Sequence, residues 1–383
     1  MSPLRFLTSG ESHGKCLLSV LDGIPAGLAL QEDRINHDLA RRQGGHGRGG
    51  RMKIETDRVQ IQAGIRNHVT IGGPLGILIE NKDFKINELP AVTRPRPGHA
   101  DLAGAIKFLR GDMRDILERA SARETTSRVA IGAICKIFLE AFEIEIVSHV
   151  VEIGDVRANV DGLSFDDIAK RESQSPVRCA DTAASAKMVK GIDAAKEARD
   201  TLGGVYEVRV RNLPVGLGSY TQWDRKLDGR LGQAILSIQA HKGVEVGDGI
   251  WGARQRGSEV HDEIFYDKAK AKKGSGMRFF RKTNRAGGVE GGMTNGEELV
   301  VRAFMKPIST LMKPLASVDI KTKESFLATV ERSDTCAVPA AGVVGEAAVA
   351  FVLADAMLEK FGGDSMDEIK RNHRAYVQQV KDF

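Results

Sequence analysis

Two histidines in this 383-residue chain stand in polar segments whose neighbours would let them act on a bound ligand. His13 follows Ser12 in GESHG at residues 10–14, and His99 lies in RPGHAD at residues 96–101. Imidazole titrates near neutral pH and is the side chain most often used to donate or accept a proton in catalysis. Glycines permit close approach of a ligand, and prolines stiffen the backbone around the second histidine. Both segments indicate acid–base chemistry, although a basic loop with a solvated histidine fits the second one equally well.

Clustered arginines could hold an anion next to these histidines. Seven lie from Arg34 to Arg66 and seven more from Arg94 to Arg128. Planar guanidinium groups suit the recognition of phosphate and carboxylate. The segment RASARETT at 119–126 adds hydroxyls and backbone amides just before an expected helix start, a common position for a bound phosphate. The alternative for any single arginine is a solvated basic face.

Three other motif matches point to different classes of protein. GESHG also fits the GxSxG of a serine hydrolase, but that motif needs a helix after its serine, whereas residues 15–22 favour a strand. Residues 247–252 fit GxGxxG without the long helix of a dinucleotide-binding fold. The Arg/Gly-rich segment 41–52 is similar to RNA-binding RGG sequences, but the chain is poor in aromatic residues that could stack on bases. A serine hydrolase and a basic RNA-binding protein are therefore the alternative functions.

The composition is that of a globular protein, with 42% hydrophobic residues, 28% charged residues and a net charge of +5. The four cysteines lack the CxxC or Cys/His spacing of a metal site, so we expect neither a metal nor a disulfide framework. Apolar runs are shorter than the roughly 20 residues of a membrane span, and the N-terminus shows no secretory signal. We expect a cytoplasmic protein without nucleic-acid or membrane partners.

Helices and strands must position these motifs, and hydrophobic periodicity predicts where they lie. Strands are expected at residues 4–8, 15–22, 144–153, 204–210, 243–256 and 298–305, with a hairpin at 52–65 and 69–80. Helices are expected at 33–42, from 101 onward, after 125–127, at 183–199, 227–240 and 339–360, and at the C-terminus. Residues 268–296 are predicted to be irregular. Because hairpins and helices occur without βαβ regularity, the pattern favours an α+β fold, with residues 1–383 forming one domain.

Seven segments, in order and over nearly the whole chain, resemble the chorismate synthase family. They are GESHG at 10–14, RRQGGHGRGGRM at 41–52, RPGHAD at 96–101, RASARETTSRV at 119–129, GGMTNG at 291–296, KPIST at 306–310 and ERSD at 331–334. Each segment alone is a weak signal, and their common order makes the resemblance specific. The resemblance implies a β-α-β sandwich, in which antiparallel sheets enclose a helical layer, with internal duplication and assembly as a homotetramer.

The resemblance also implies a reaction and a cofactor. Members of that family convert 5-enolpyruvylshikimate 3-phosphate to chorismate by an anti-1,4 elimination of phosphate, the last step of the shikimate pathway. They need reduced FMN although no net redox change occurs. The substrate and FMN together bring several anionic groups, which clustered arginines without a metal motif would serve. Because no nicotinamide-binding turn or reductase domain is evident, NADPH would act only indirectly, through an external flavin reductase.

Carried over onto this sequence, the resemblance implies roles for individual residues. Catalytic roles fall to Ser12, His13, His99, Ser121 and Asp334, with His13 keeping the flavin in its protonated reduced form and Asp334 drawing a proton toward flavin N5. Positions that match FMN contacts are Arg119, Ala120, Ser121, Gln239, Ala240, Gly292, Lys306, Pro307, Ile308, Ser309, Thr310 and Arg332. Positions that match substrate or NADP contacts are Arg42, Arg48, Arg96 and Arg123. Ala120 and Gln239 stand where many relatives have serine and asparagine, and both changes keep size or polarity.

Overall fold

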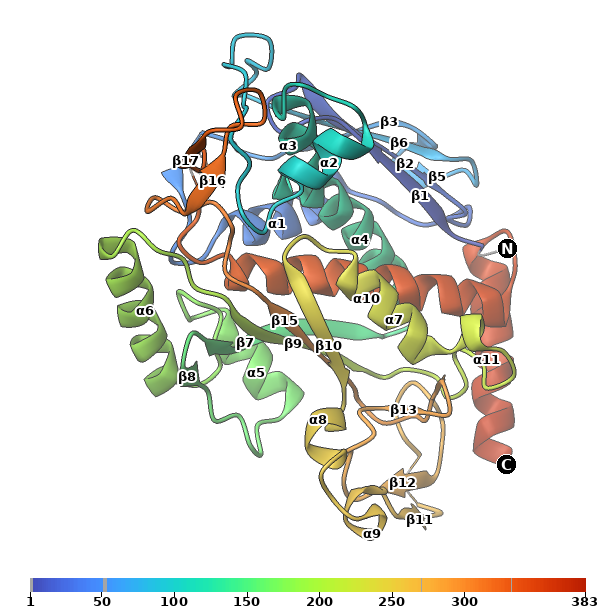
Figure 1. Cartoon of the computed structure of the whole chain (residues 1–383). Helices are drawn as coiled ribbons and strands as arrows, with labels where there is room; N and C mark the ends of the chain where they lie inside the picture. Colours follow the sequence, from blue (N-terminus) through green and yellow to red (C-terminus); the bar gives the residue numbers. More distant parts are fainter. Residues whose placement is uncertain (1–2, 51–53, 270, 332) are drawn as a thin grey trace.

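A four-stranded antiparallel sheet is formed by the N-terminal part of the chain (Figure 1). The computed structural model describes residues 3–50, 54–269, 271–331 and 333–383. The strand order is β1–β2–β6–β3, with β1 at Arg5–Ser9, β2 at Cys16–Asp22, β3 at Val59–Ala63 and β6 at Leu75–Glu80. Leu17 and Leu21 of β2 and Ile77 and Ile79 of β6 are buried, whereas their strand neighbours are more exposed. This alternation is expected of a sheet that covers a core on one face only.

A second antiparallel sheet comes from the C-terminal part of the chain. Its order is β10–β15–β9–β7–β8, with β7 at Glu145–Ile153, β8 at Val156–Arg157, β9 at Gly204–Arg211, β10 at His241–Val246 and β15 at Leu299–Met305. Apolar residues of β9 and β15 are fully buried because helices cover this sheet. Tyr206 of β9 is among the largest of these, and its hydroxyl is 2.8 Å from Nε2 of His241.

The two halves of the chain repeat one topology. In the first half, the main strands are β1, β2, β3 and β6, and they pair in the spatial order first–second–fourth–third. In the second half, β7, β9, β10 and β15 pair in the same order. A core helix follows the second strand and another follows the fourth strand in each half. The repeated order confirms the internal duplication that was expected.

Four helices form the layer between the sheets, as Figure 1 shows for α10. They are α1 at Glu32–Gln43, α4 at Thr125–Glu140, α7 at Leu227–Leu236 and α10 at Val338–Phe361. Helix α10 packs on α4, α7, β7 and β9, while α4 also contacts α1 and β2. The α+β fold and the β-α-β sandwich are therefore confirmed.

Helices α4 and α10 approach each other closely at Gly132. A Cβ atom at this position would overlap Cα and Cβ of Ala347 on α10. The surrounding interior is apolar, and both Ile131 and Ala133 are buried. Glycine is thus required here by the distance between the helices rather than by its backbone freedom.

Buried charges also join the helices of this layer. The Glu346 carboxylate of α10 accepts hydrogen bonds from Arg41 of α1 at 2.7 and 2.8 Å and from Lys136 of α4 at 2.9 Å. The main-chain N–H and the hydroxyl of Ser148 on β7 also donate to Oε1. Burial by itself raises the pKa of Glu346, but these cations outweigh it and hold the pKa well below its usual value. A salt-bridge network therefore connects both halves of the chain.

The remaining elements complete the fold. They are β4 Ile65–Arg66, β5 Val69–Thr70, α2 Asp101–Lys107, α3 Arg114–Ala120, η2 Ala122–Glu124, α5 Phe165–Glu172, α6 Thr182–Glu197, η3 Trp223–Arg225, α8 Gly249–Gly252, α9 Gly257–Val260, β11 Ile264–Tyr266, β12 Phe279–Arg281, β13 Val289–Glu290, β14 Met293–Thr294, β16 Ala316–Val318, β17 Ser325–Leu327 and α11 Met366–Asp382. Figure 1 shows α2, α3 and the β16–β17 hairpin together at the top of the molecule.

Two expectations about the elements need correction. The strand expected at 243–256 is wrong beyond Val246, because Gly247 adopts a φ of +60° and the chain continues into the four-residue helix α8. The region 268–296 is not wholly irregular, since β12, β13 and β14 lie within it. The expected hairpin at 52–65 and 69–80 is formed by β3 and β6, although residues 51–53 lie outside the described part of the chain.

One helix, α10, is long and apolar enough to cross a membrane by length and composition. Its most apolar window is 89% buried inside the protein, as is typical of the core helix of a globular fold.

Candidate active site

The GESHG segment forms the turn between β1 and β2 and is bound by Glu118 of α3. The main-chain N–H of Ser12 donates to the Glu118 carbonyl at 2.9 Å. The N–H of His13 donates to Oε2 of Glu118 at 2.7 Å, and its Nδ1 lies 2.9 Å from Oε1. On the other side of the ring, Nε2 is 3.7 Å from Oδ2 of Asp83. The histidine therefore lies between two carboxylates, and a strand follows the turn where a hydrolase elbow needs a helix.

The RASARETT segment lies against this turn. The Ser121 hydroxyl donates to Oγ of Ser12 at 3.2 Å, and it also accepts a hydrogen bond from the N–H of Arg123. The Arg119 guanidinium donates to the carbonyls of Thr8 and Gly10 at 2.9 and 3.1 Å. Ala120 ends α3 and is half-buried. The structure thus brings together two motifs that lie more than 100 residues apart.

Two of the predicted arginines are buried beneath these motifs. Arg123 donates to Asp57 at 2.5 Å and to Asn81 at 2.9 Å, while Arg42 donates to Thr125 and to the Ala122 carbonyl. Burial lowers the pKa of Arg42 to about 10. Nη1 of Arg42 and Nη2 of Arg123 are buried and make no hydrogen bond to the described residues. Each of these two nitrogens lies 3.7 Å from a carboxylate oxygen, that of Asp57 for Arg42 and that of Glu55 for Arg123.

His99 belongs to a second cluster, which contains Arg96 and Asp101. Nδ1 of His99 lies 2.5 Å from Oδ1 of Asp101, whose side chain is fully buried. Arg96 donates to Oδ2 of Asp101 at 2.8 Å and to the Thr310 hydroxyl at 2.8 Å. Burial would raise the pKa of Asp101, but hydrogen bonds from His99 and Arg96 outweigh it and hold the pKa below its usual value.

The KPIST segment is held next to this second cluster. Nζ of Lys306 donates to the Gly98 carbonyl at 2.7 Å, and its N–H donates to the carbonyl of Ala240. The Ile308 carbonyl accepts a hydrogen bond from the Thr201 hydroxyl. Pro307 is exposed and Ser309 is half-buried. The structure therefore joins three of the predicted segments, at residues 96–101, 239–240 and 306–310, around one histidine.

Asp334 is fixed by the Arg/Gly-rich loop after α1. Nη1 of Arg48 lies 2.6 Å from its Oδ2, and the N–H of Gly49 donates to its Oδ1 at 2.6 Å. Glu331, three residues before Asp334, accepts a hydrogen bond from Arg114 of α3 at 3.0 Å. The segment that carries Asp334 therefore also contacts α3. Arg332, a predicted FMN contact, lies outside the described residues.

Gly292 is not brought to these clusters by any contact within the described chain. It lies in the β13–β14 turn with a φ of +89°, and its carbonyl accepts from the N–H of Leu227. Figure 1 shows β13 in the lower half of the molecule, whereas α3 is at the top.

Carboxylates complete the site, and sequence reasoning did not assign them. Glu118 binds His13, Asp101 binds His99 and Asp57 binds Arg123. Asp101 belongs to the RPGHAD motif and could have been proposed from its spacing of two residues to the histidine. Glu118 and Asp57 had no such signal, because their partners are distant in the sequence.

The donors and acceptors around these clusters fit FMN. Lys306, Ser309 and Arg119 offer a cation and a hydroxyl of the kind that a phosphate group needs. Gln239 donates through Nε2 to Glu124 at 3.2 Å, while its buried Oε1 accepts no hydrogen bond from the described residues. A buried acceptor without a donor suits an N–H of a bound ring.

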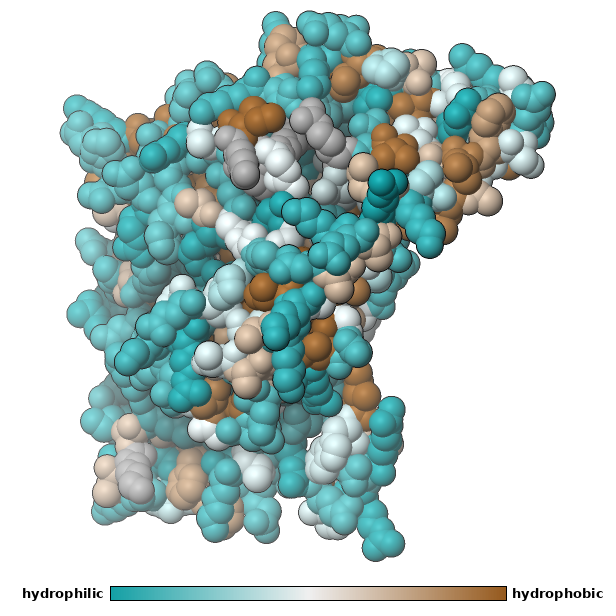
Figure 2. All heavy atoms as spheres, turned by 90° about the vertical axis from the view of Figure 1, so that its left-hand side faces the viewer, coloured by the Kyte–Doolittle hydropathy of each residue, from teal (hydrophilic) through white to brown (hydrophobic). Residues whose placement is uncertain are grey.

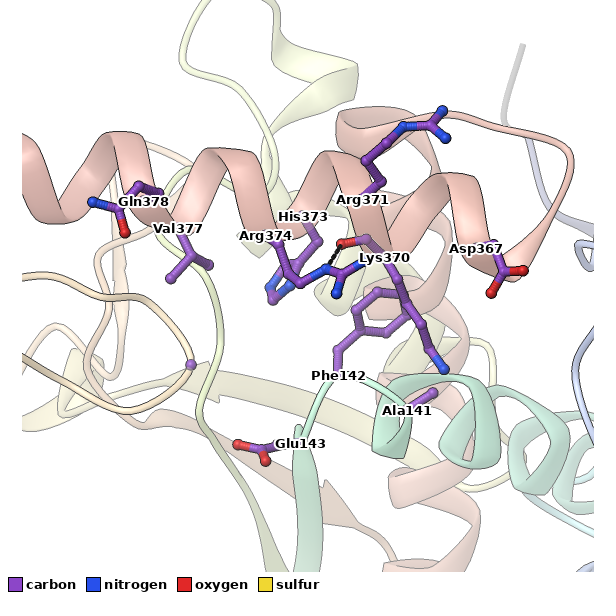
Figure 3. Close-up of a pocket in the computed structure, with 11 residues that line it drawn as sticks. Ala141, Phe142, Glu143, Asp367, Lys370, Arg371, His373, Arg374, Val377 and Gln378 are labelled. Carbon is purple, nitrogen blue, oxygen red and sulfur yellow. Dashed lines mark hydrogen bonds between the residues drawn. The ribbon is translucent and has the colours of Figure 1, made fainter.

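A well-formed cavity lies elsewhere, between the end of α4 and α11 (Figure 3). It has a volume of about 790 Å³ and contains none of the predicted site residues. Figure 3 shows Lys370 extending toward Ala141 and Arg371 pointing away from the cavity. A cavity of about 10 Å³, large enough for roughly one water molecule, lies against Arg96 and Ser309. The larger of these two cavities therefore does not contain the motif residues.

Two carboxylate-bound histidines, accompanied by arginines and hydroxyls on the loops of a two-sheet sandwich, define an acid–base enzyme that acts on an anionic ligand. The family model of chorismate synthase matches residues 4–358. Chorismate synthases from Geobacter metallireducens and Symbiobacterium thermophilum are each 54% identical to this chain, covering 99% and 98% of it and 100% and 99% of their own lengths. A crystal structure of chorismate synthase is 44% identical, with a TM-score of 0.81 and 99% coverage of both chains.

The chain therefore belongs to the chorismate synthase family. Membership confirms the resemblance, the fold and the enzyme class, a carbon–oxygen lyase of aromatic biosynthesis. The assignments of individual site residues stay predictions.

Proposed function

We propose that this protein eliminates phosphate from 5-enolpyruvylshikimate 3-phosphate to give chorismate, the last step of the shikimate pathway, with reduced FMN as cofactor. The observation that carries the proposal is the pairing of His13 with Glu118 and of His99 with Asp101 in a chain of this family. One C–H bond and one C–O bond of the substrate break, a C=C bond forms and phosphate leaves. No net oxidation or reduction accompanies these changes.

Cofactor binding falls to residues with suitable donors and acceptors. Arg119, Ser121, Gln239, Ala240 and the segment 306–310 would hold FMN. Reduced FMN supplies an electron-rich ring that assists the departure of phosphate. The chain's own part is to orient this ring and to exclude water from it.

Proton transfer falls to the two histidines and Asp334. Nδ1 of each histidine faces a carboxylate, so Nε2 is the ring nitrogen that would exchange a proton with a ligand, and in His99 this nitrogen lies 3.4 Å from Nη2 of Arg96. The carboxylate of Asp334 is bound by Arg48 and Gly49, which hold it in place.

Anion binding falls to the arginines. Arg48 and Arg96 are each anchored by an aspartate, Asp334 and Asp101, so their planar groups are held in fixed directions. Arg42 and Arg123 would bind a phosphate or a carboxylate through nitrogens that make no hydrogen bond to the described residues and lie 3.7 Å from Asp57 and Glu55.

Assembly as a homotetramer is proposed as well. Leu7, Leu18 and Val20 are exposed on the outer face of the first sheet, as are Ile106 and Phe108 near α2. Figure 2 shows a mostly hydrophilic side of the molecule, with hydrophobic side chains chiefly in its upper part. Large exposed apolar side chains are typical of subunit interfaces.

Location, domain structure and partners follow from the same family. We propose a cytoplasmic enzyme in which residues 1–383 act as one domain, supported by one hydrophobic cluster that contains buried residues from Leu4 to Ile369. An external flavin reductase would supply the reduced cofactor.

The test is an anaerobic assay of chorismate formation with substrate and FMN, before and after reduction of the flavin by dithionite. We expect product only with reduced FMN. The same reaction without protein, and with oxidised FMN, are the controls. Absence of product with reduced FMN would contradict the proposal. Labelling of Ser12 by a fluorophosphonate would favour a hydrolase, and salt-sensitive RNA binding without any flavin effect would favour the RNA-binding alternative.

A further inference from the structure

Glu118 binds both the backbone and the ring of the His13 turn. Its carbonyl accepts from Ser12, Oε2 accepts from the N–H of His13, and Oε1 faces Nδ1 of the same residue. The side chain of Glu118 is 1% exposed, so water does not compete for these contacts. Glu118 thus fixes how the imidazole is rotated, and it shares the anchoring of the turn with Asn81, whose amide donates to the carbonyls of Glu11 and Gly14.

The carboxylate also determines which ring nitrogen carries a proton. Burial would raise the pKa of Glu118, but the hydrogen bonds from His13 and the charge of Arg114 outweigh it and lower the pKa. An ionised carboxylate accepts hydrogen bonds and cannot donate them, so Nδ1 of His13 must be the donor. In neutral His13, Nε2 is then the unprotonated nitrogen.

Nε2 is directed away from α3. Its distance of 3.7 Å to Oδ2 of Asp83 is longer than a hydrogen bond. Asp83 is itself 2.6 Å from Nζ of Lys85, which compensates its charge. The His13 side chain is 15% exposed, so part of the imidazole is open to a ligand without movement of the turn.

Arg114 holds Glu118 from the other side. Its Nη1 lies 3.5 Å from Oε1 of Glu118, and its Nη2 donates to Glu331 at 3.0 Å. The contacts therefore run from His13 through Glu118 and Arg114 to the segment that carries Asp334. Asp83 faces the imidazole and Arg114 faces its carboxylate, and these two groups are paired in turn with Lys85 and Glu331.

We propose that Glu118 is the positioning residue of His13: it keeps the Nδ1–H tautomer, presents Nε2 to the reacting ligand and links this histidine to the segment of Asp334. The proposal rests on the proposed role of His13 in proton transfer. In this proposal Glu118 acts through His13 and its turn, and not on the reacting atoms.

The test compares Glu118→Gln and Glu118→Asp with Glu140→Gln, a control that removes a carboxylate from an exposed ion pair with Arg34. The readouts are kcat, KM and the tautomer of His13 from ¹⁵N NMR of histidine-labelled protein without cofactor, assigned by the loss of its signals in His13→Gln. We expect Glu118→Gln to lower kcat by roughly 10- to 100-fold with little change in KM and to mix the two tautomers. The aspartate should keep the Nδ1–H tautomer and recover part of kcat, and the control should match the wild type.

An unchanged tautomer and an unchanged kcat in folded Glu118→Gln would overturn the proposal. If that variant does not fold, Glu118→Met, which fills the same buried space without an acceptor, gives the same NMR test. A wild-type kcat in His13→Gln would refute the role of His13 in the reaction, yet a mixed tautomer in Glu118→Gln would still support the positioning by Glu118. The two failures are therefore distinguishable.

Discussion

Arg48 and Asp334 form an ion pair of 2.6 Å although 286 residues separate them in the chain. The second oxygen of Asp334 accepts from the N–H of Gly49, also at 2.6 Å. The guanidinium side chain is 10% exposed and the carboxylate 19%. The Arg/Gly-rich loop and the C-terminal ERSD segment thus form one structural unit, in which the arginine is oriented before any ligand arrives.

Replacement of Arg48 should weaken the binding of the anionic substrate. We expect Arg48→Ala to cost about 1.5–3 kcal/mol, the typical value of a hydrogen bond to a charged group. Arg48→Lys should recover only part of this, because the lysine keeps the charge but loses the planar fork that pairs with Asp334. Substrate titration by calorimetry measures the effect, and Arg58→Ala, at an exposed position, is the control. Full recovery by lysine would show that charge alone matters.

Replacement of His13 should slow the reaction without unfolding the protein. We expect His13→Ala to lower kcat by roughly 10- to 10⁴-fold, the range of general acid–base contributions. The control is His37→Ala, because the His37 side chain is 72% exposed on α1. Steady-state rates with reduced FMN give the comparison, and circular dichroism checks the fold. Wild-type turnover in folded His13→Ala would refute the role.

The chain should not reduce its own flavin. The GxGxxG at 247–252 contains only the four-residue helix α8, so a pyrophosphate-binding helix is missing there. We expect a mixture of protein, FMN, NADPH and substrate, kept anaerobic and dark, to form no chorismate until dithionite or light reduces the flavin. Sustained product formation in the dark would contradict this prediction and indicate an intrinsic reductase activity.

Gly132 should tolerate no larger side chain. A Cβ there would overlap the backbone of α10, so we expect Gly132→Ala to destabilise the protein by about 1–3 kcal/mol or more. Gly191 of α6 has open space around its Cα, and Gly191→Ala should instead stabilise by up to about 1 kcal/mol through helix propensity. Urea unfolding of the two variants tests the contrast. Equal changes in the free energy of unfolding would mean that α4 and α10 can move apart with little loss of stability.

The network around Glu346 should make stability fall in acid. The pKa of Glu346 is lowered in the folded protein, so its contribution is complete above the usual value of 4.5 and is lost as the pH falls below it. We expect Glu346→Gln to lose about 3–5 kcal/mol at pH 7, because Arg41 and Lys136 lose a buried partner. The variant should also depend less on pH between about 5 and 3.

Urea unfolding at several pH values measures both effects, with Glu140→Gln as a surface control expected to change by less than about 0.5 kcal/mol. A similar loss in the two variants would show that burial of the Glu346 network is unimportant.

Local patterns predicted the helices well and the ends of strands less well. The expected helix 339–360 is α10 within one residue at each end, because its apolar run and the glycines after it are local signals. The strand 243–256 failed at Gly247, whose positive φ is imposed by contact with the turn around Arg285 and Ala286. This contact joins residues that are distant in the sequence, so the residues next to Gly247 do not predict it.

The site residues, too, were predictable only where the signal is local. The motif histidines and arginines could be selected from their residue types, but their partners could not. Pairing of His13 with Glu118 depends on how α3 packs on the β1–β2 turn, across 105 residues. Strand order within each sheet likewise follows from long-range pairing, so hydrophobic periodicity could predict the strands but not the order that reveals the duplication.

The duplicated strand order has a consequence for fragments of this chain. A cut between α4 and β7 would separate two similar halves, and each half would keep only two of the four helices of the layer. Helix α4 would lose its contacts with α10, and β7 of the second sheet would lose its contacts with α4. The cut would break the ion pairs of Glu346 with Arg41 and Lys136, which would leave Asp38 as the partner of these two cations and Arg178 as the partner of Glu346. The halves, produced separately, should stay unfolded or aggregate, and mixing them should restore the fold by fragment complementation.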